Sequence, residues 1–141
     1  ARLSFYIQLA YSQQSWEVYT KLYLMERIFS DAIKTDAKWA AAKDLLGFGS
    51  YTRTEAAAIN TGNDFMYVAA SKIAGKDYSN YFSAWGIEVS AKAKAQVAAN
   101  GFVEQVPALF YYVHKELPAV MPTMLDAIPL DGVRTWVDPM P

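Results

Sequence analysis

The chain has 141 residues, of which 53% are apolar and 19% are charged, so it is long enough and apolar enough to form the core of a single domain over residues 1–141. Its 13 basic and 14 acidic residues give a net charge of -1. This balance disfavours a general nucleic-acid-binding protein, because such proteins carry a basic excess. The absence of cysteine and the presence of one histidine exclude disulfides, a thiol nucleophile and a zinc site built mainly from Cys and His.

The apolar pattern of the first expected helix begins at Leu3, and no Ser, Thr, Asp or Asn that could cap this helix comes before it. This pattern favours the C-terminal piece of a longer protein, and the alternative is a small free-standing protein with a trimmed N-terminus. A second helix is expected to open at Ser15, and a third over residues 37–46 is expected to end at Gly47. A short helical turn is expected at residues 54–59.

Three further helices are expected in succession, and each has a polar residue at its start and a glycine after its end. They cover residues 64–74, 78–85 and 91–99. The expected caps are Asn63, Asp77 and Ser90. The agreement between caps, apolar stripes and terminal glycines indicates helices along this whole part of the chain.

The pattern changes after residue 101, where β-branched and aromatic residues and several prolines replace the helical stripes. A buried strand is expected over residues 107–113, and a short β-element over residues 133–137 follows the turn signal Asp131-Gly132. The sequence therefore predicts a mainly α fold. It is a compact bundle of about six short helices over roughly residues 2–100, with a small β-rich C-terminal element over roughly residues 101–141.

Motifs for chemistry are absent from the sequence. No uncharged stretch reaches the roughly 18 apolar residues of a membrane span, so no span is expected. The acidic residues do not follow the spacing of an EF-hand, and neither G-x-S-x-G nor a glycine-rich phosphate motif is present. We therefore expect no metal bound by this chain, and the lack of cysteine leaves its compartment open.

The aromatic residues are the remaining candidates for binding. Four tryptophans could contribute to a surface on which sugars stack, and they are Trp16, Trp39, Trp85 and Trp136. Trp85 lies between Phe82 and Ile87 and is expected in the core. Trp16, at the start of a helix, and Trp136, in the proline-rich tail, are candidate substrate contacts, with burial in the core as the alternative.

Residues 77–90, DYSNYFSAWGIEVS, contain a Y-F-x-x-W-G-[hydrophobic]-x-[hydrophobic]-S pattern. This pattern resembles the signature near the end of the catalytic region of M60-like, enhancin-type zinc metallopeptidases. The first two helices resemble the paired helices that follow the metal site in that family. Other segments are similar to its bacterial mucin-degrading branch, which includes the immunomodulating metalloprotease group. The matching segments are 2–9, 16–23, 91–97 and 101–102.

The resemblance implies a secreted or bacterial cell-surface zinc endopeptidase that acts on O-glycosylated, mucin-like proteins. That family holds zinc with H-E-x-x-H on a helix and a downstream Glu, and this chain has no H-E-x-x-H. The resemblance therefore implies that the chain is the C-terminal helical subdomain and is inactive alone. Its partner would be the catalytic half of the same polypeptide, which binds the zinc upstream of Ala1.

Two further expectations follow from the resemblance. His114 or Tyr112 (or Tyr111 beside it) could donate a hydrogen bond to the oxyanion of the transition state, with an ordinary strand and its polar end as the alternative. Contact with the catalytic half should leave an apolar face on the isolated chain, and the candidates are Leu3, Tyr6, Ile7 and the flank 16–23. The rival function is a non-catalytic helical module that binds glycans or a protein through exposed aromatic residues.

Overall fold

The computed structural model describes residues 2–111 and 126–130. The helices in this part of the chain are α1 (Arg2–Ser12), α2 (Glu17–Ala32), α3 (Asp36–Ala42), α4 (Arg53–Ala58), α5 (Asn63–Ala74), α6 (Ser79–Ala84) and α7 (Ala91–Ala99). The strands are β1 (Lys76–Asp77), β2 (Val103–Glu104), β3 (Ala108–Tyr111) and β4 (Asp126–Pro129). The prediction of a mainly α fold is confirmed.

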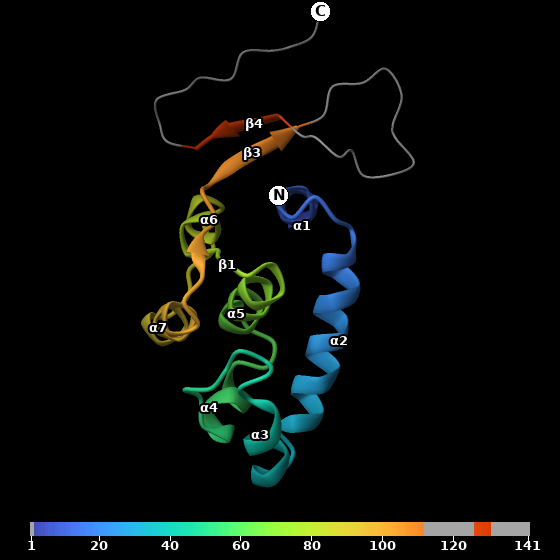
Figure 1. Cartoon of the computed structure of the whole chain (residues 1–141), viewed down its shortest axis with the longest axis vertical. Helices are drawn as coiled ribbons and strands as arrows, with labels where there is room; N and C mark the ends of the chain where they lie inside the picture. Colours follow the sequence, from blue (N-terminus) through green and yellow to red (C-terminus); the bar gives the residue numbers. More distant parts are fainter. Residues whose placement is uncertain (1, 112–125, 131–141) are drawn as a thin grey trace, which may run out of the picture.

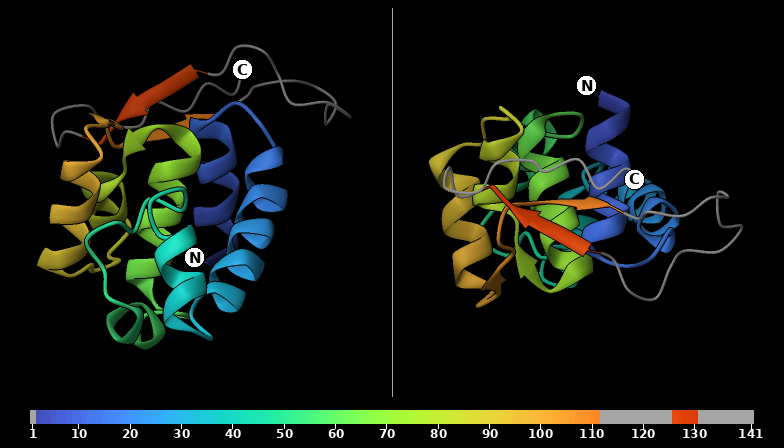
Figure 2. Two further views of the ribbon diagram at one scale, coloured as in Figure 1. Left: turned by 60° about the horizontal axis from the view of Figure 1, so that its bottom comes forward. Right: turned by 90° about the horizontal axis from the view of Figure 1, so that it is seen from above.

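Helix α5 lies at the centre of the bundle, with α2 on one side and α7 on the other (Figure 1). Helices α3 and α4 lie together at one end of the long axis, and β3 and β4 cross the opposite end above α1 (Figures 1 and 2). The middle of α5 is buried on all sides, because its residues 67–71 are all buried. A helix that is buried nearly all round acts as the hub on which the others pack.

Local signals set most helix ends. Ser90 caps α7 by accepting a hydrogen bond from the Ala93 amide at 3.1 Å, as predicted. Gly75 follows α5 with φ +64°, a left-handed conformation that favours glycine. Two expected caps are displaced, because Asn63 is the first residue of α5 and Asp77 precedes the N-cap of α6. Asp77 still accepts a hydrogen bond from the Ser79 amide at 2.8 Å.

The strands form two separate pairs. Strands β1 and β2 are parallel, with Lys76 opposite Val103, and this pair was not predicted from the sequence. Strands β3 and β4 are antiparallel, with Tyr111 opposite Asp126. The strand expected over residues 107–113 is confirmed as β3 over residues 108–111, but it is less buried than expected, since Leu109 and Phe110 are only partly buried. The β-element expected over residues 133–137 lies outside the described residues.

One hydrophobic core joins all seven helices, and aromatic rings are its largest members. Phe29 of α2 is fully buried, and its ring lies 4.9 Å from those of both Phe48 and Phe65 and 5.3 Å from that of Trp39. Trp39 donates its indole N–H to the Tyr51 carbonyl at 2.8 Å, so its polar atom is satisfied within the core. This aromatic cluster fixes the packing of α3 and residues 47–51 against α2 and α5.

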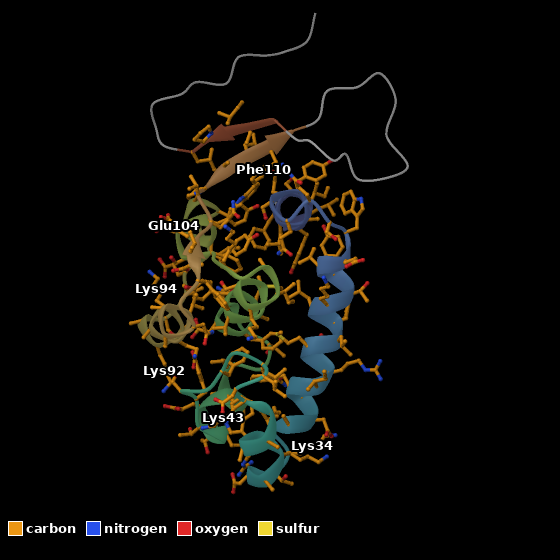
Figure 3. The ribbon with its side chains drawn as sticks, viewed as in Figure 1. Lys34, Lys43, Lys92, Lys94, Glu104 and Phe110 are labelled. Carbon is orange, nitrogen blue, oxygen red and sulfur yellow. The ribbon has the colours of Figure 1, made fainter. Side chains whose placement is uncertain are left out.

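The side chain of Gln8 ties β3 to α1. Its Nε2 donates to the Phe110 carbonyl at 2.8 Å, and its Oε1 accepts from the Phe110 amide at 2.7 Å. Phe110 lies on β3 where the strand passes above α1 (Figure 3). The two hydrogen bonds satisfy both backbone groups of one strand residue, so Gln8 acts as a neighbouring strand would.

We expect Gln8→Leu to lower the free energy of unfolding by about 2 kcal/mol, because both polar backbone groups of Phe110 lose their partner. Urea denaturation measures the loss, and hydrogen exchange should show faster exchange of the Phe110 amide. Gln105→Leu is the matched control, since among the described residues the Gln105 side chain donates only to the adjacent Val106 carbonyl at 3.3 Å, and we expect a change within about 0.5 kcal/mol. Equal effects of the two substitutions would contradict the role given to Gln8.

Candidate functional site

A groove with a volume of about 730 Å³ opens between α1, α2 and the start of α5. Its rim carries four aromatic side chains, and these are Tyr6, Trp16, Tyr19 and Tyr23. The opposite wall comes from Asn60, Thr61 and Gly62, before α5, and from Phe65 and Met66 within it. The groove is predominantly apolar, which is typical of sites that bind a partner or a ligand.

Packing between rings holds Trp16 at the rim of the groove. Its ring lies 5.7 Å from that of Tyr11 in an edge-to-face arrangement and 6.1 Å from that of Tyr19. The Tyr19 hydroxyl donates to the Tyr6 carbonyl at 2.6 Å, which fixes α2 against α1. Burial raises the pKa of Tyr19, and Tyr11 adds to this shift. Trp16 therefore has a fixed orientation although 44% of its surface is exposed.

The Y-F-x-x-W-G motif has a structural role next to this groove. Phe82 is fully buried, and its ring lies edge-to-face against Phe5 of α1 at 5.2 Å. Trp85 packs against the core while also lining a second, smaller hollow of about 410 Å³. Tyr6 and Met66 line both hollows, so the motif and the aromatic rim belong to one continuous concave face.

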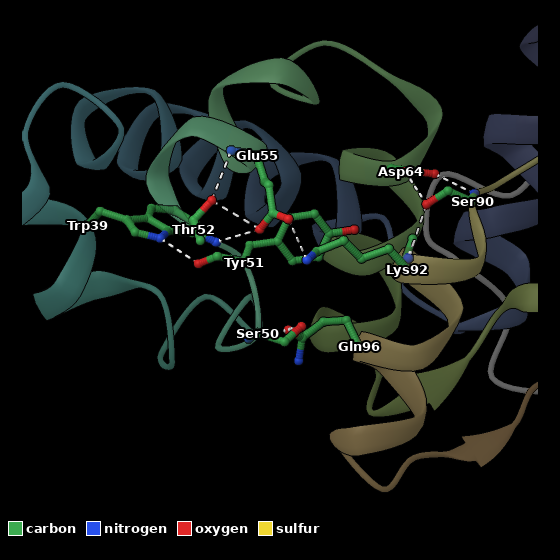
Figure 4. Close-up of polar contacts among 10 residues, drawn as sticks. Trp39, Ser50, Tyr51, Thr52, Glu55, Asp64, Ser90, Lys92 and Gln96 are labelled. Carbon is green, nitrogen blue, oxygen red and sulfur yellow. Dashed lines mark hydrogen bonds and ion pairs between the residues drawn. The ribbon is translucent and has the colours of Figure 1, made fainter.

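A polar network joins α4, α5 and α7 at another part of the surface (Figure 4). Lys92 pairs with Glu55 at 2.8 Å, and its ammonium lies 5.0 Å from the centre of the Tyr51 ring. The hydrogen bond from Lys92 and those from Thr52 lower the pKa of Glu55 to about 2. Ser90 donates to Asp64 from both its amide, at 2.8 Å, and its hydroxyl, at 2.6 Å. These contacts cap helices and fix their ends, which indicates a structural role.

Two buried tyrosines also have structural partners. The Tyr67 hydroxyl donates to Asp77 at 2.8 Å, and the Tyr78 hydroxyl lies 2.7 Å from that of Ser12. Burial is the main cause that raises the pKa of both phenols, and Asp77 raises that of Tyr67 further. Both phenols are therefore neutral at physiological pH, and they join α5 to β1 and α1 to the residue before α6 rather than act as bases.

Residues 2–111 and 126–130 contain no group of three or more His, Cys, Asp or Glu side chains that could hold a metal ion. Over the same residues, no helix is both long enough and apolar enough to cross a membrane.

The candidate binding and catalytic residues differ in how exposed the structure leaves them. Trp16 lies on the rim of the groove, whereas Trp39 is buried and Trp85 is partly buried against the core. Tyr112, His114 and Trp136 lie outside the described residues. The sequence indicated the α1 and α2 sides of the groove through their exposed apolar positions. It gave no signal for the wall at residues 60–62, because that wall exists only through the tertiary packing of α5 on α2.

Comparisons with known proteins identify the class to which this fold belongs. No family model matches the chain. A curated bacterial metalloprotease is 41% identical over 102 residues, which are 70% of this chain. Solved structures of a metallopeptidase superpose on 99% of the chain with a TM-score of 0.74 and 29% or 30% identity. The chain is therefore homologous to one region of an M60-like metallopeptidase.

The curated relative is the immunomodulating metalloprotease of Pseudomonas aeruginosa. The solved structures are the IMPa metallopeptidase from that species, its complex with an O-glycopeptide, and the IMPa metallopeptidase in complex with T-antigen. The chain spans 10% of the curated relative and 16% of the solved chains. The region shared with this chain is thus a small part of a much longer polypeptide in these relatives.

Proposed function

We propose that this chain is the C-terminal helical subdomain of a secreted or bacterial cell-surface zinc metalloprotease that cleaves mucin-like, O-glycosylated proteins. The observation that carries the proposal is the 41% identity to the immunomodulating metalloprotease, together with superposition over 99% of the chain on IMPa structures. Two of those structures are complexes with an O-glycopeptide and with T-antigen. Glycosylated protein is therefore the class of substrate that we assign to the parent enzyme.

The zinc of the parent enzyme would be held outside this chain. The sequence contains no H-E-x-x-H, and the described residues offer no cluster of metal ligands. A zinc peptidase needs three protein ligands and a water on the metal, so the catalytic half of the same polypeptide, upstream of Ala1, would supply the ligands and the general base. The bound zinc would activate that water for attack on the peptide bond.

Within this proposal the chain contributes shape and substrate contacts. Trp16 offers a fixed, partly exposed aromatic face, and Trp136 is the second proposed substrate contact. His114 or Tyr112 is proposed to donate a hydrogen bond to the oxyanion of the transition state. These roles belong to the complete enzyme, so we expect no peptidase activity from residues 1–141 alone.

The alternative function is a non-catalytic helical module that binds glycans or a protein. The observation in its favour is the aromatic rim of the groove, because concave apolar sites with a few polar groups are typical of binding sites. The two functions differ in what they require. The module would bind glycan through this chain without metal, whereas the subdomain would depend on the zinc of the remaining polypeptide.

The deciding experiment compares the complete parent protein with residues 1–141 on an O-glycosylated mucin-type glycoprotein. We expect the parent to cleave it, a zinc chelator to abolish cleavage, and added zinc to restore it, because activity depends on a metal-bound water. The same glycoprotein without its O-glycans is the control and should resist cleavage. A parent that cleaves neither form, combined with metal-independent glycan binding by residues 1–141, would favour the binding module.

A further inference from the structure

The groove presents large apolar side chains to its surroundings. Leu3 is 73% exposed, Tyr23 is 70% exposed and Trp16 is 44% exposed, and all three line it. Glu26 is the one charged side chain among the described residues that line the groove. Apolar, aromatic surface with little charge is the composition found in the buried centre of protein interfaces.

This apolar surface is extended rather than local. Tyr6, Gly62 and Met66 line both the groove and the smaller hollow that leads to Trp85 of α6. The concave face therefore runs from α2 across the start of α5 to the end of α6. Lysines labelled in Figure 3 lie elsewhere, on α7 and around α3. A face of this length fits a protein surface better than it fits a single small molecule.

We propose that the part of this groove around Leu3 and Tyr23 is the surface on which the zinc-binding part of the same polypeptide packs, with Trp16 left accessible at its edge, an inference that rests on the proposed function. In the solved relatives the matching fold is 16% of a longer chain, so the remaining polypeptide is large enough to cover an extended face. Under the proposed function the zinc-binding part precedes Ala1 and is covalently joined to α1. Leu3, in the first turn of α1, lines the groove. This covalent link holds the preceding part close to the groove at high effective concentration.

A second apolar hollow on another side of α2 is the competing surface. It has a volume of about 350 Å³ and is lined by Leu24, Ile28 and Leu45 among others. Its lining includes Lys21 and no aromatic side chain or residue of α1. Aromatic residues are enriched and lysines depleted at the centres of interfaces, so the aromatic groove is the better match for the catalytic part.

Cysteine labelling of the complete parent protein tests this assignment. Tyr23→Cys places a thiol on the groove, and Leu45→Cys places one on the competing surface, where Leu45 is 80% exposed. Residues 1–141 contain no cysteine, so each introduced thiol is unique within them. Maleimide labelling is followed by mass spectrometry of the tryptic peptides 22–27 and 44–53, in native protein and in urea.

We expect the thiol at position 23 to react at least about 100-fold more slowly in native protein than in urea, because labelling then requires opening of the interface. The thiol at position 45 should react within about tenfold of its rate in urea, because it stays exposed. Protection at position 23 should be the same after tenfold dilution, since the occupant is covalently linked. Leu3→Cys is a second groove variant that should behave like Tyr23→Cys.

Three results would overturn the assignment. Equal reactivity at positions 23 and 45 would mean that the groove is open, and protection at position 45 alone would assign the other hollow. Protection at position 23 that disappears on dilution would assign the groove to a second copy of the chain. Cleavage of the glycoprotein is measured on the same samples. An active protease with a reactive thiol at position 23 would refute the groove as the interface while the proposed function stands. A thiol at position 23 that is protected in a protein without protease activity would support the interface and refute the proposed function.

Discussion

Replacing Phe82 with alanine is expected to lower the free energy of unfolding by about 3–5 kcal/mol, the cost of removing a buried aromatic ring. Phe82 is fully buried, and its ring lies 5.2 Å from that of Phe5 and 5.6 Å from that of Tyr67. The substitution therefore leaves a cavity between α1, α5 and α6. Since domains are stable by only about 5–15 kcal/mol, urea denaturation followed by tryptophan fluorescence should show a large shift of the midpoint.

Tyr81→Phe is the control from the same motif. Tyr81 is also fully buried, but its hydroxyl has no hydrogen-bond partner among the residues that the structure describes. Removing a buried polar group that lacks a partner should leave stability unchanged within about 1 kcal/mol or raise it. A loss at Tyr81→Phe as large as that at Phe82→Ala would show that the motif is stabilised by its hydroxyl rather than by ring packing.

Part of the fold, above all the ends of several helices, could be predicted from the sequence. Helix ends depend on nearby residues, so the sequence indicated the cap at Ser90 and the ends of helices at Gly75, Gly86 and Gly101. The helix expected to run to Gly47 was predicted too long, because α3 ends at Ala42 and turns connect it to Gly47. The structure gives all four glycines a positive φ. Gln14 also has a positive φ of 51°, and no local pattern marks it, because Gln has no preference for this conformation.

Features that depend on distant residues were not predictable in the same way. The pairing of β1 with β2 joins residues near 76 to residues near 103 through two positions per strand, which is too short for an alternating pattern. The clamp of Gln8 on Phe110 joins residues 102 positions apart. A glutamine on an apolar helix face gives no indication of its partner until the strand is placed beside it.

In the candidate site, too, the features set by nearby residues could be predicted and those set by distant residues could not. The exposed apolar positions of α1 and the first turns of α2 marked one side of the groove, and Trp16 was expected to be less buried than Trp85. The structure confirms a partly exposed Trp16, although the Tyr11 ring of α1 packs against it. The opposite wall at residues 60–62 became visible only in the structure, since these residues reach the groove through the packing of α5.

The proposed helper role of His114 predicts a loss of about 100-fold in kcat when His114→Ala is introduced into the complete parent enzyme, the cost typical of removing one donor to an oxyanion. KM should change little, because such a donor acts mainly in the transition state. Turnover of the O-glycosylated glycoprotein at saturating substrate measures the effect. Zinc content should stay the same, since His114 is not proposed as a ligand.

Tyr112→Phe separates the two candidates for this role, because it removes only the hydroxyl that could donate. Gln8 holds Phe110, two residues before Tyr112, through both of its backbone groups, so the strand that leads to both candidates is anchored to α1. We therefore expect Gln8→Leu in the complete enzyme to lower kcat in the same direction as the true donor variant, but by less, because the donor itself remains. If His114→Ala and Tyr112→Phe both turn over substrate at the parent rate, the two side chains are an ordinary strand and its polar end, and the oxyanion is stabilised from the catalytic half alone.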